Sequence, residues 1–328
     1  MPGPGVVRSG FSLLVAAWAA GCGPRDLALS GGDAPAAPAL GPYGHLALAL
    51  SRARAEDGVD YARLAADPAP LDAFLRQLAD WGPRTAPHDF PDRPAALAYA
   101  LNAYNALMLR SVLEFGERGA GPPRRLPADL ESRYRVRIDG RPATAAELRQ
   151  EARRRADGDW RVRLALCDGR AIGPPLPPRP FLPDLLDAQL DESVRRALAA
   201  DGVVRVDHGE QKRLRVWSGL YAERERLVGD YEARRGVRGA VLLNVLLEWS
   251  DRPRRLWLNT AVGYAVAPLP DDGRSNARPH TSAAARRGLG DALRDIRGIR
   301  FARPDAAAGG SDGSGRGPNA AGGPLPPR

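Results

Sequence analysis

The chain has 328 residues, 44% of them hydrophobic, and its 48 Lys and Arg residues against 39 Asp and Glu residues give a formal charge of +9. Length and apolar content allow one core of about 200 to 230 residues. The charge suits nucleic acid, but the cations are dispersed arginines, with Lys212 the only lysine, and no groove-reading or base-stacking motif accompanies them. We therefore expect no nucleic-acid partner.

Residues 1–22 predict a bacterial export signal. Arg8 supplies a positive start, residues 11–20 form a short apolar run, and Ala19-Ala20-Gly21-Cys22 ends the segment at a cysteine. This end resembles the lipobox of bacterial lipoproteins, although that motif more often has leucine at the place of Ala19. The resemblance implies that Cys22 is lipidated and anchors the protein to a membrane of the cell envelope, facing the periplasm in a Gram-negative cell. An ordinary cleaved signal and a retained apolar tail are the alternatives.

Residues 23–42 are rich in Gly, Ala and Pro and predict a flexible tether, and a globular domain is expected over residues 43–270. The longest helical pattern of this domain covers residues 94–116, with one apolar stripe. Asn102 and Asn105 lie beside the stripe, one turn apart, with Tyr104 between them. Their amides are placed to reach the backbone of a neighbouring segment, so these three residues are candidates for a structural latch or for the wall of a groove.

Beyond this helix, the pattern alternates between strands and helices. Residues 134–138 predict a strand that ends in a tight turn at Asp139-Gly140, and Thr144 with Glu147 fits a capping box. Residues 160–167 alternate and predict a buried strand. The remaining elements predicted are helices over 45–54, 70–81, 184–200, 220–231 and 240–249, a hairpin of 203–206 with 214–217, and a strand within 256–266.

These elements predict an α+β fold: a single compact domain with several amphipathic helices around a small, mostly antiparallel sheet. Residues 271–303 are basic, and 283–300 have the pattern of a short amphipathic helix, which suits either a peripheral membrane contact or packing on the domain. The composition of residues 304–328, dominated by Gly, Ala, Ser and Pro, predicts disorder.

Four segments of the chain form a recognisable set: Val59-Asp60-Tyr61, Leu101 to Leu107, Leu185 to Leu198 and Tyr221-Ala222-Glu223. Together they resemble the bacterial family called domain of unknown function 547. They occur in matching order over roughly residues 43–260, and the run around Asn102 and Asn105 is the most specific of them. The family has no settled biochemical activity, so the resemblance implies a domain identity and not a reaction.

The chain departs from this family at its polar positions. Family members have a tryptophan where this chain has Ala100, a Glu-His pair at the places of Arg149 and Gln150, and a histidine at the place of Arg163. Two family cysteines before the Pro174-Pro175-Leu176 run correspond to Asp168 and Gly173, and Cys167 stands one residue early. The joint loss of both cysteines suggests a shared role, as a disulfide or a redox pair.

The candidates for chemistry are therefore few. Cys167 suits a nucleophile activated by His208, with Asp168 or Asp207 as the orienting carboxylate, but also a small buried residue. The four histidines are far apart in sequence and none has ligand spacing, so neither a metal site nor a cofactor is expected.

Three functional hypotheses remain. The first is a non-catalytic, or catalytically degenerate, envelope lipoprotein that binds an unknown envelope protein or small ligand through a groove near Asn102, Asn105 and the proline-rich loop. The second is a cysteine-dependent hydrolase or transferase that acts in the envelope through Cys167. The third is a purely structural envelope protein.

Overall fold

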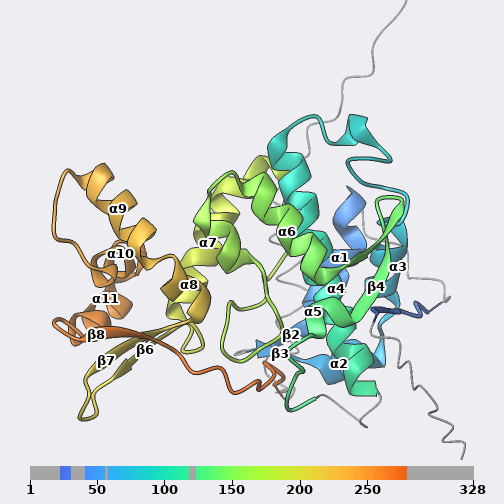
Figure 1. Cartoon of the computed structure of the whole chain (residues 1–328). Coiled ribbons are helices and arrows are strands. Elements are labelled where there is room, and N and C mark those ends of the chain that lie inside the picture. Colours follow the sequence, from blue (N-terminus) through green and yellow to red (C-terminus); the bar gives the residue numbers. More distant parts are fainter. Residues whose placement is uncertain (1–22, 31–40, 56–57, 118–122, 279–328) are drawn as a thin grey trace, which may run out of the picture.

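The computed structural model describes residues 23–30, 41–55, 58–117 and 123–278. Within them the buried apolar side chains form two clusters, and Figure 1 shows the corresponding groups of elements on either side of α7 (Leu186–Ala199). Leu186 and Leu190 of α7 belong to the first cluster, and Val194, Ala197 and Leu198 to the second. One amphipathic helix therefore contributes to both cores.

The first group surrounds α4 (Arg93–Glu117) and holds most of the helices that precede α7. α6 packs along α4, and α3 packs against both α1 and α4. The other helices of this group are α1 (Gly44–Ala53), α2 (Tyr61–Ala66), α3 (Ala69–Gln77), α5 (Leu130–Arg133) and α6 (Ala145–Ala156), with 3-10 turns η1 (Gly41–Tyr43), η2 (Pro87–Asp89), η3 (Trp160–Ala165) and η4 (Pro183–Leu185).

The helix α4 is the centre of this group. Its first turn is capped by the Asp92 carboxylate, which accepts a hydrogen bond from the Ala95 amide at 2.8 Å. Every residue from 95 to 113 is buried, so the single apolar stripe predicted from the sequence is too narrow. A helix that is covered on all sides tolerates polar residues only where they find partners inside the protein.

The α+β fold is confirmed, and the strands of the described residues form three small sheets. β4 (Tyr134–Ile138) and β5 (Arg141–Thr144) form the predicted hairpin, and Asp139 and Gly140 both have positive φ, as a tight two-residue turn requires. The predicted capping box then starts α6: Thr144 and Glu147 exchange side-chain to backbone hydrogen bonds. β2 (Arg54–Ala55) and β3 (Gly58–Val59) form a second antiparallel pair.

The second group carries the remaining sheet and the later helices. The predicted hairpin of β6 (Val204–Asp207) and β7 (Arg213–Val216) is present, and β8 (Ala265–Pro268) joins β7 in parallel. The helices of this group are α8 (Ser218–Ala222), α9 (Arg224–Arg235), α10 (Leu242–Trp249) and α11 (Arg252–Asn259).

The buried strand predicted over residues 160–167 is wrong, because this segment forms η3. The Asp159 carboxylate caps the turn by accepting from the Arg161 amide at 3.0 Å, and the Arg161 guanidinium bonds to the carboxylates of Asp159, Asp187 and Asp191. Val162 and Ala165 point into the first core and Leu164 into the second. The alternation of apolar residues thus reflects two cores and not the two faces of a strand.

The strand predicted within residues 256–266 is also partly wrong. Residues 252–259 form α11, which begins where the Asp251 carboxylate accepts from the Arg254 amide at 2.9 Å, with Pro253 in the first turn. Only β8, at the end of the predicted range, is extended. Aspartate followed by proline in the first turn is a helix start signal that outweighs the apolar spacing beyond it.

Both predicted boundaries of the globular domain need correction. In the predicted tether, β1 (Arg25–Asp26) pairs in parallel with β4, Leu27 is buried, and Ser30 bonds to Asp72. Past residue 270, Ser275 and Asn276 are buried and bridge to earlier loops. The signal segment 1–22 with Cys22, the basic helix expected at 283–300 and the tail 304–328 lie outside the described residues.

Candidate functional site

The two asparagines of α4 bond to the backbone of the proline-rich loop. The Asn102 amide nitrogen donates to the Phe181 carbonyl at 2.8 Å, and its oxygen accepts from the Phe181 amide at 2.8 Å. Asn105 does the same one turn later, donating to the Ala165 carbonyl and accepting from the Cys167 amide, each at 3.0 Å. Each side-chain carboxamide thereby makes the two hydrogen bonds, one donated and one accepted, that a residue of a paired β-strand would make.

This geometry fixes the loop at both ends. Phe181 lies at its C-terminal end and Cys167 at its N-terminal end, and each asparagine is 2% exposed. Neither amide faces an open groove, so the groove wall expected at Asn102 and Asn105 is not at these residues. Their role is to hold the loop that lines the cavity described below.

Tyr104 projects to another face of α4 and has a different partner. Its hydroxyl donates to Glu131 at 2.5 Å, and the same carboxylate forms an ion pair with Arg149 at 2.5 Å. Burial raises the pKa of the Tyr104 phenol well above its ordinary value, and the charge of Glu131 adds to the effect. Arg149 is one of the positions at which the chain departs from the family resemblance, and here it joins α6 to α5.

Arg163, another such position, also forms an ion pair, with Glu223 at 2.6 Å. It links η3 to the start of α9 across the boundary between the two groups of elements. Both arginines therefore have defined structural contacts in this fold.

The only thiol among the described residues, that of Cys167, is 3% exposed. The Asn276 amide donates to its sulfur at 3.4 Å, and Asn276 in turn accepts from the Tyr61 hydroxyl at 3.0 Å. Burial raises the pKa of the Cys167 thiol to about 12, and the nearby charge of Asp168 contributes. The residue is therefore a neutral thiol at physiological pH, whereas nucleophilic chemistry requires a thiolate.

The Asp168 side chain contacts Arg170 of the same loop. Its carboxylate accepts from the Arg170 amide at 3.0 Å and lies 4.0 Å from the Arg170 guanidinium. Burial raises the pKa of Asp168 to about 6, opposed by the hydrogen bond from the Arg170 backbone.

His208 lies elsewhere, at the end of the β6–β7 hairpin in the second group of elements. Its Nδ1 is 3.0 Å from the Tyr264 hydroxyl, and Tyr264 packs against the second core. Asp207 beside it bonds to Arg215 across the hairpin. The structure thus does not bring His208 or Asp207 together with Cys167, and the catalytic arrangement considered from the sequence is not assembled.

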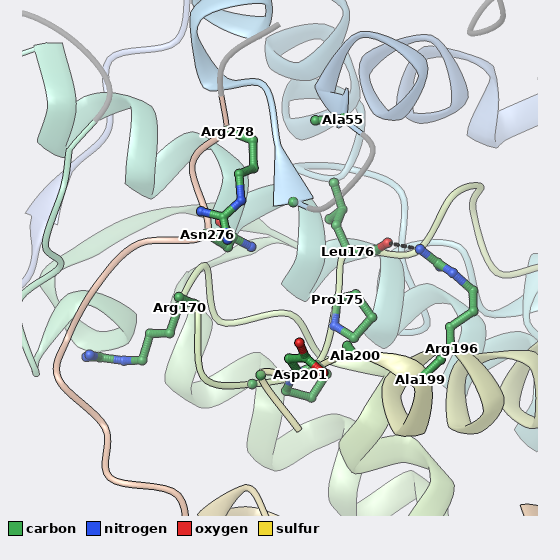
Figure 2. A pocket seen from close by; sticks show the side chains of 15 residues that line it. Ala55, Arg170, Pro175, Leu176, Arg196, Ala199, Ala200, Asp201, Asn276 and Arg278 are labelled. Atoms are coloured by element: carbon green, nitrogen blue, oxygen red, sulfur yellow. Dashed lines mark hydrogen bonds between the residues drawn. The ribbon is translucent and has the colours of Figure 1, made fainter. Parts of the chain in front are cut away.

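A cavity of about 510 Å³ opens beside the proline-rich loop (Figure 2). Gly173 to Leu176 form one wall, and the end of α7 with Asp201 and Gly202 forms another. The third consists of Ala55 of β2, Gly58 of β3, Asn276 and Arg278. Gly202 is required here, because a Cβ atom would lie 2.1 Å from the Ala171 carbonyl oxygen. Three arginines line the cavity: Arg170, Arg196 and Arg278.

Sequence reasoning identified the proline-rich loop but missed these arginines. Arg196 lies within a helical pattern, and Arg278 lies in the basic segment expected outside the domain. The chain has 48 Lys and Arg residues, so no single arginine is conspicuous. The pair becomes apparent only in the fold, where Arg196 at the end of α7 and Arg278 line the same cavity.

Two further features bear on the class of protein. Among the described residues, no group of three or more His, Cys, Asp or Glu side chains is arranged to hold a metal ion. In the same part of the chain, no helix combines the length and apolarity needed to span a membrane.

The fold and the site together define an α+β domain in which a central buried helix holds a proline-rich loop over a cationic cavity. Residues 88–197, which include α4, α6 and most of α7, match the family described as protein of unknown function, DUF547. The family resemblance expected from the sequence is therefore confirmed, over a shorter range than 43–260. Comparison with curated proteins and with solved structures gave no match.

Proposed function

We propose that the protein is a lipid-anchored lipoprotein of the bacterial cell envelope whose domain binds a ligand or partner without catalysing a reaction. The observation that carries the binding role is the juxtaposition of an inert thiol with an open cavity. Cys167 is buried and neutral and has no histidine of the described residues beside it, while the loop that follows it lines a cavity of about 510 Å³. Such volumes are typical of small-molecule sites.

The departures from the family pattern support the same proposal. Arg149 and Arg163 replace residues that suit acid–base chemistry, and both form ion pairs that join elements of the fold. An arginine is always protonated and cannot act as a general base. In this chain, positions 149 and 163 therefore have a structural role, since each joins two elements through an ion pair.

The anchor is proposed from the sequence that ends at Cys22. Two residues, Gly23 and Pro24, separate Cys22 from Arg25 at the start of β1, so the two Cα atoms are at most about 11 Å apart in an extended chain. An acylated Cys22 would therefore hold the domain close to the membrane surface, because β1 is paired with β4 and is not part of a long tether.

Cys22→Ser tests the anchor. In a bacterial host, we expect the wild-type chain in the membrane fraction with the mass of the acylated mature protein, and we expect the variant to lose both the added mass and the membrane attachment. A variant that stays membrane-bound with the wild-type mass would overturn the lipoprotein assignment.

The same variant tests the absence of cysteine chemistry, because Cys167 is then the only thiol of the chain. We expect a thiol-directed reagent to label native Cys22→Ser slowly and the urea-unfolded protein rapidly, with Cys22→Ser/Cys167→Ala as the unlabelled control. Rapid stoichiometric labelling of the native protein would favour the cysteine-dependent hydrolase or transferase instead.

A further inference from the structure

The charges that line the cavity beside the proline-rich loop are not balanced. Among the described residues, its lining contains Arg170, Arg196 and Arg278 but only one carboxylate, that of Asp201. The Asp201 side chain is 79% exposed and lies 3.8 Å from Arg254, a residue that does not line the cavity. The described part of the lining therefore carries an excess of positive charge.

The three arginines differ in how well they are compensated. Arg170 forms an ion pair with Asp271 at 3.3 Å and donates to the Pro127 carbonyl at 2.9 Å. Arg196 and Arg278 bond only to backbone carbonyls, those of Leu176 at 3.0 Å and Ala277 at 3.3 Å. Among the described residues, no carboxylate lies within ion-pair distance of either guanidinium.

Arg196 is the more constrained of these two. Burial lowers the pKa of its guanidinium, and the charges of Arg54 and Arg179 add to this effect, while Glu192 opposes it. A partly buried cation among like charges costs free energy unless an anion compensates it. Figure 2 shows Arg196 on one side of the cavity and Arg278 on the opposite side, with Pro175 and Leu176 between them.

We infer that this cavity binds the phosphoryl group of a small molecule, with Arg196 and Arg278 of its lining as the cationic partners. A phosphoryl group carries a charge of about −1.5 to −2 at neutral pH, which matches two guanidinium groups that have no ion-pair partner among the described residues. The planar fork of arginine presents paired donors that fit phosphate oxygens. The cavity volume of about 510 Å³ leaves room for an organic part beside that group.

Two sets of hydrogen bonds hold Arg196 and Arg278 in place. Asn276 is 8% exposed and bonds to Tyr61 and Cys167, so it fixes the segment that carries Arg278. The Arg196 bond to the Leu176 carbonyl joins α7 to the loop that Asn102 and Asn105 hold. The buried Cys167 thus serves as a packing partner of Asn276.

The inference rests on the proposed binding role and specifies its ligand class. A phosphoryl group reaches the cell envelope either on a soluble phosphate ester or on a phospholipid headgroup. Three titrants distinguish these sources: inorganic phosphate, glycerol 3-phosphate and the soluble short-chain lipid dihexanoyl phosphatidic acid.

The test is isothermal titration calorimetry on the full-length protein in a neutral detergent at constant ionic strength. We expect saturable binding with one site per chain, and Arg196→Gln should weaken it at least 10-fold. Arg195→Gln is the matched control, because it removes the same charge from the adjacent exposed residue of α7, which does not line the cavity. It should change the affinity less than 2-fold.

Arg278→Gln provides a second variant, because this exposed side chain bonds only to the Ala277 carbonyl and its loss leaves the fold intact. It should also weaken binding at least 10-fold. Binding of the short-chain lipid alone, with the same sensitivity to both variants, would assign the phosphoryl group to a headgroup.

Absence of saturable binding by all three titrants, or equal weakening by Arg195→Gln and Arg196→Gln, would overturn the inference. The fractionation and labelling results for Cys22 and Cys167 are independent of this outcome. A failure of the phosphate site is therefore distinguishable from a failure of the proposed function.

Discussion

Asn102 and Asn105 illustrate how single side chains determine the course of a long irregular segment. Each satisfies one backbone donor and one backbone acceptor that would otherwise be buried without a partner. A buried, unpaired backbone group costs about 1 to 3 kcal/mol. The loop between Cys167 and Phe181 contains no helix or strand, so these four bonds replace secondary structure at its two ends.

Asn105→Ala should therefore lower the free energy of unfolding by about 2 to 4 kcal/mol, because it orphans the Ala165 carbonyl and the Cys167 amide together. Urea denaturation measures the change. Ser111→Ala is the matched control on the same buried helix, since the Ser111 hydroxyl has no hydrogen-bond partner among the described residues. A loss below about 1 kcal/mol for Asn105→Ala would contradict the latch.

The raised pKa of Asp168 predicts an unusual dependence of the free energy of unfolding on pH. Burial raises the pKa of its carboxyl to about 6, from 3.8 in the unfolded chain. Between these values the native protein keeps a proton that the unfolded chain has released, so this group stabilises the fold at low pH and loses its contribution as pH rises through 6. Glu131 and Asp271 disfavour the ionised carboxylate, and Arg170 favours it.

The comparison of wild type with Asp168→Asn isolates this contribution. From pH 4 to pH 7, the wild-type free energy of unfolding should fall relative to that of the variant by about 1 to 3 kcal/mol, since one pKa unit corresponds to about 1.4 kcal/mol. Carboxylates elsewhere titrate equally in both proteins and cancel. A difference that does not change with pH would show that Asp168 has an ordinary pKa.

At the scale of elements, β1 depends on a buried ion pair. Arg110 of α4 lies 3.1 Å from Asp72 of α3, and both side chains are at most 7% exposed. Arg110 also donates to the Ala28 carbonyl, and Asp72 accepts from Ser30. This pair therefore holds residues 23–30 against the domain.

Arg110→Ala should reduce the free energy of unfolding by about 3 to 5 kcal/mol, because it leaves a buried carboxylate uncompensated. The Leu27 amide, which donates to the Arg135 carbonyl at 3.0 Å, should also lose protection from hydrogen exchange. The control is Arg133→Ala, whose partner Asp129 is 59% exposed and whose loss should cost less than about 1 kcal/mol. Equal effects of the two variants would contradict this account.

Elements with complete local signals were predictable from the sequence. α4 has Asp92 at its start and an uninterrupted apolar rhythm, α6 has its capping box, and the turn at Asp139-Gly140 defines the first hairpin. The segment 160–165 was not predictable, because Leu164 packs into a different core from its neighbours. The spacing of apolar residues predicts which side chains are buried, but it does not predict which core they pack into.

At the scale of the whole molecule, α7 joins two cores, and the cavity lies at its C-terminal end. Its described lining comes from four parts of the chain that are distant in the sequence: Ala55 with Gly58, the segment from Arg170 to Leu176, the segment from Arg196 to Gly202, and Asn276 with Arg278. A cavity assembled from such distant segments cannot be predicted from a contiguous sequence motif. The proline-rich loop was the one part that the sequence identified, through its place in the family pattern.

The sequence by itself determined the family resemblance over residues 88–197, the α+β class, the central helix with its two asparagines, and the β4–β5 and β6–β7 hairpins, because each depends on local propensity or on a contiguous motif. Only the tertiary structure decided that the asparagines hold backbone and not ligand, that Cys167 is buried away from His208, and that residues 25–30 and 271–278 pack on the domain. The physical reason is that burial, pKa and charge balance depend on neighbours that folding brings together. The central helix predicted at the outset is thus the scaffold of a loop, and the candidate site lies on the far side of that loop.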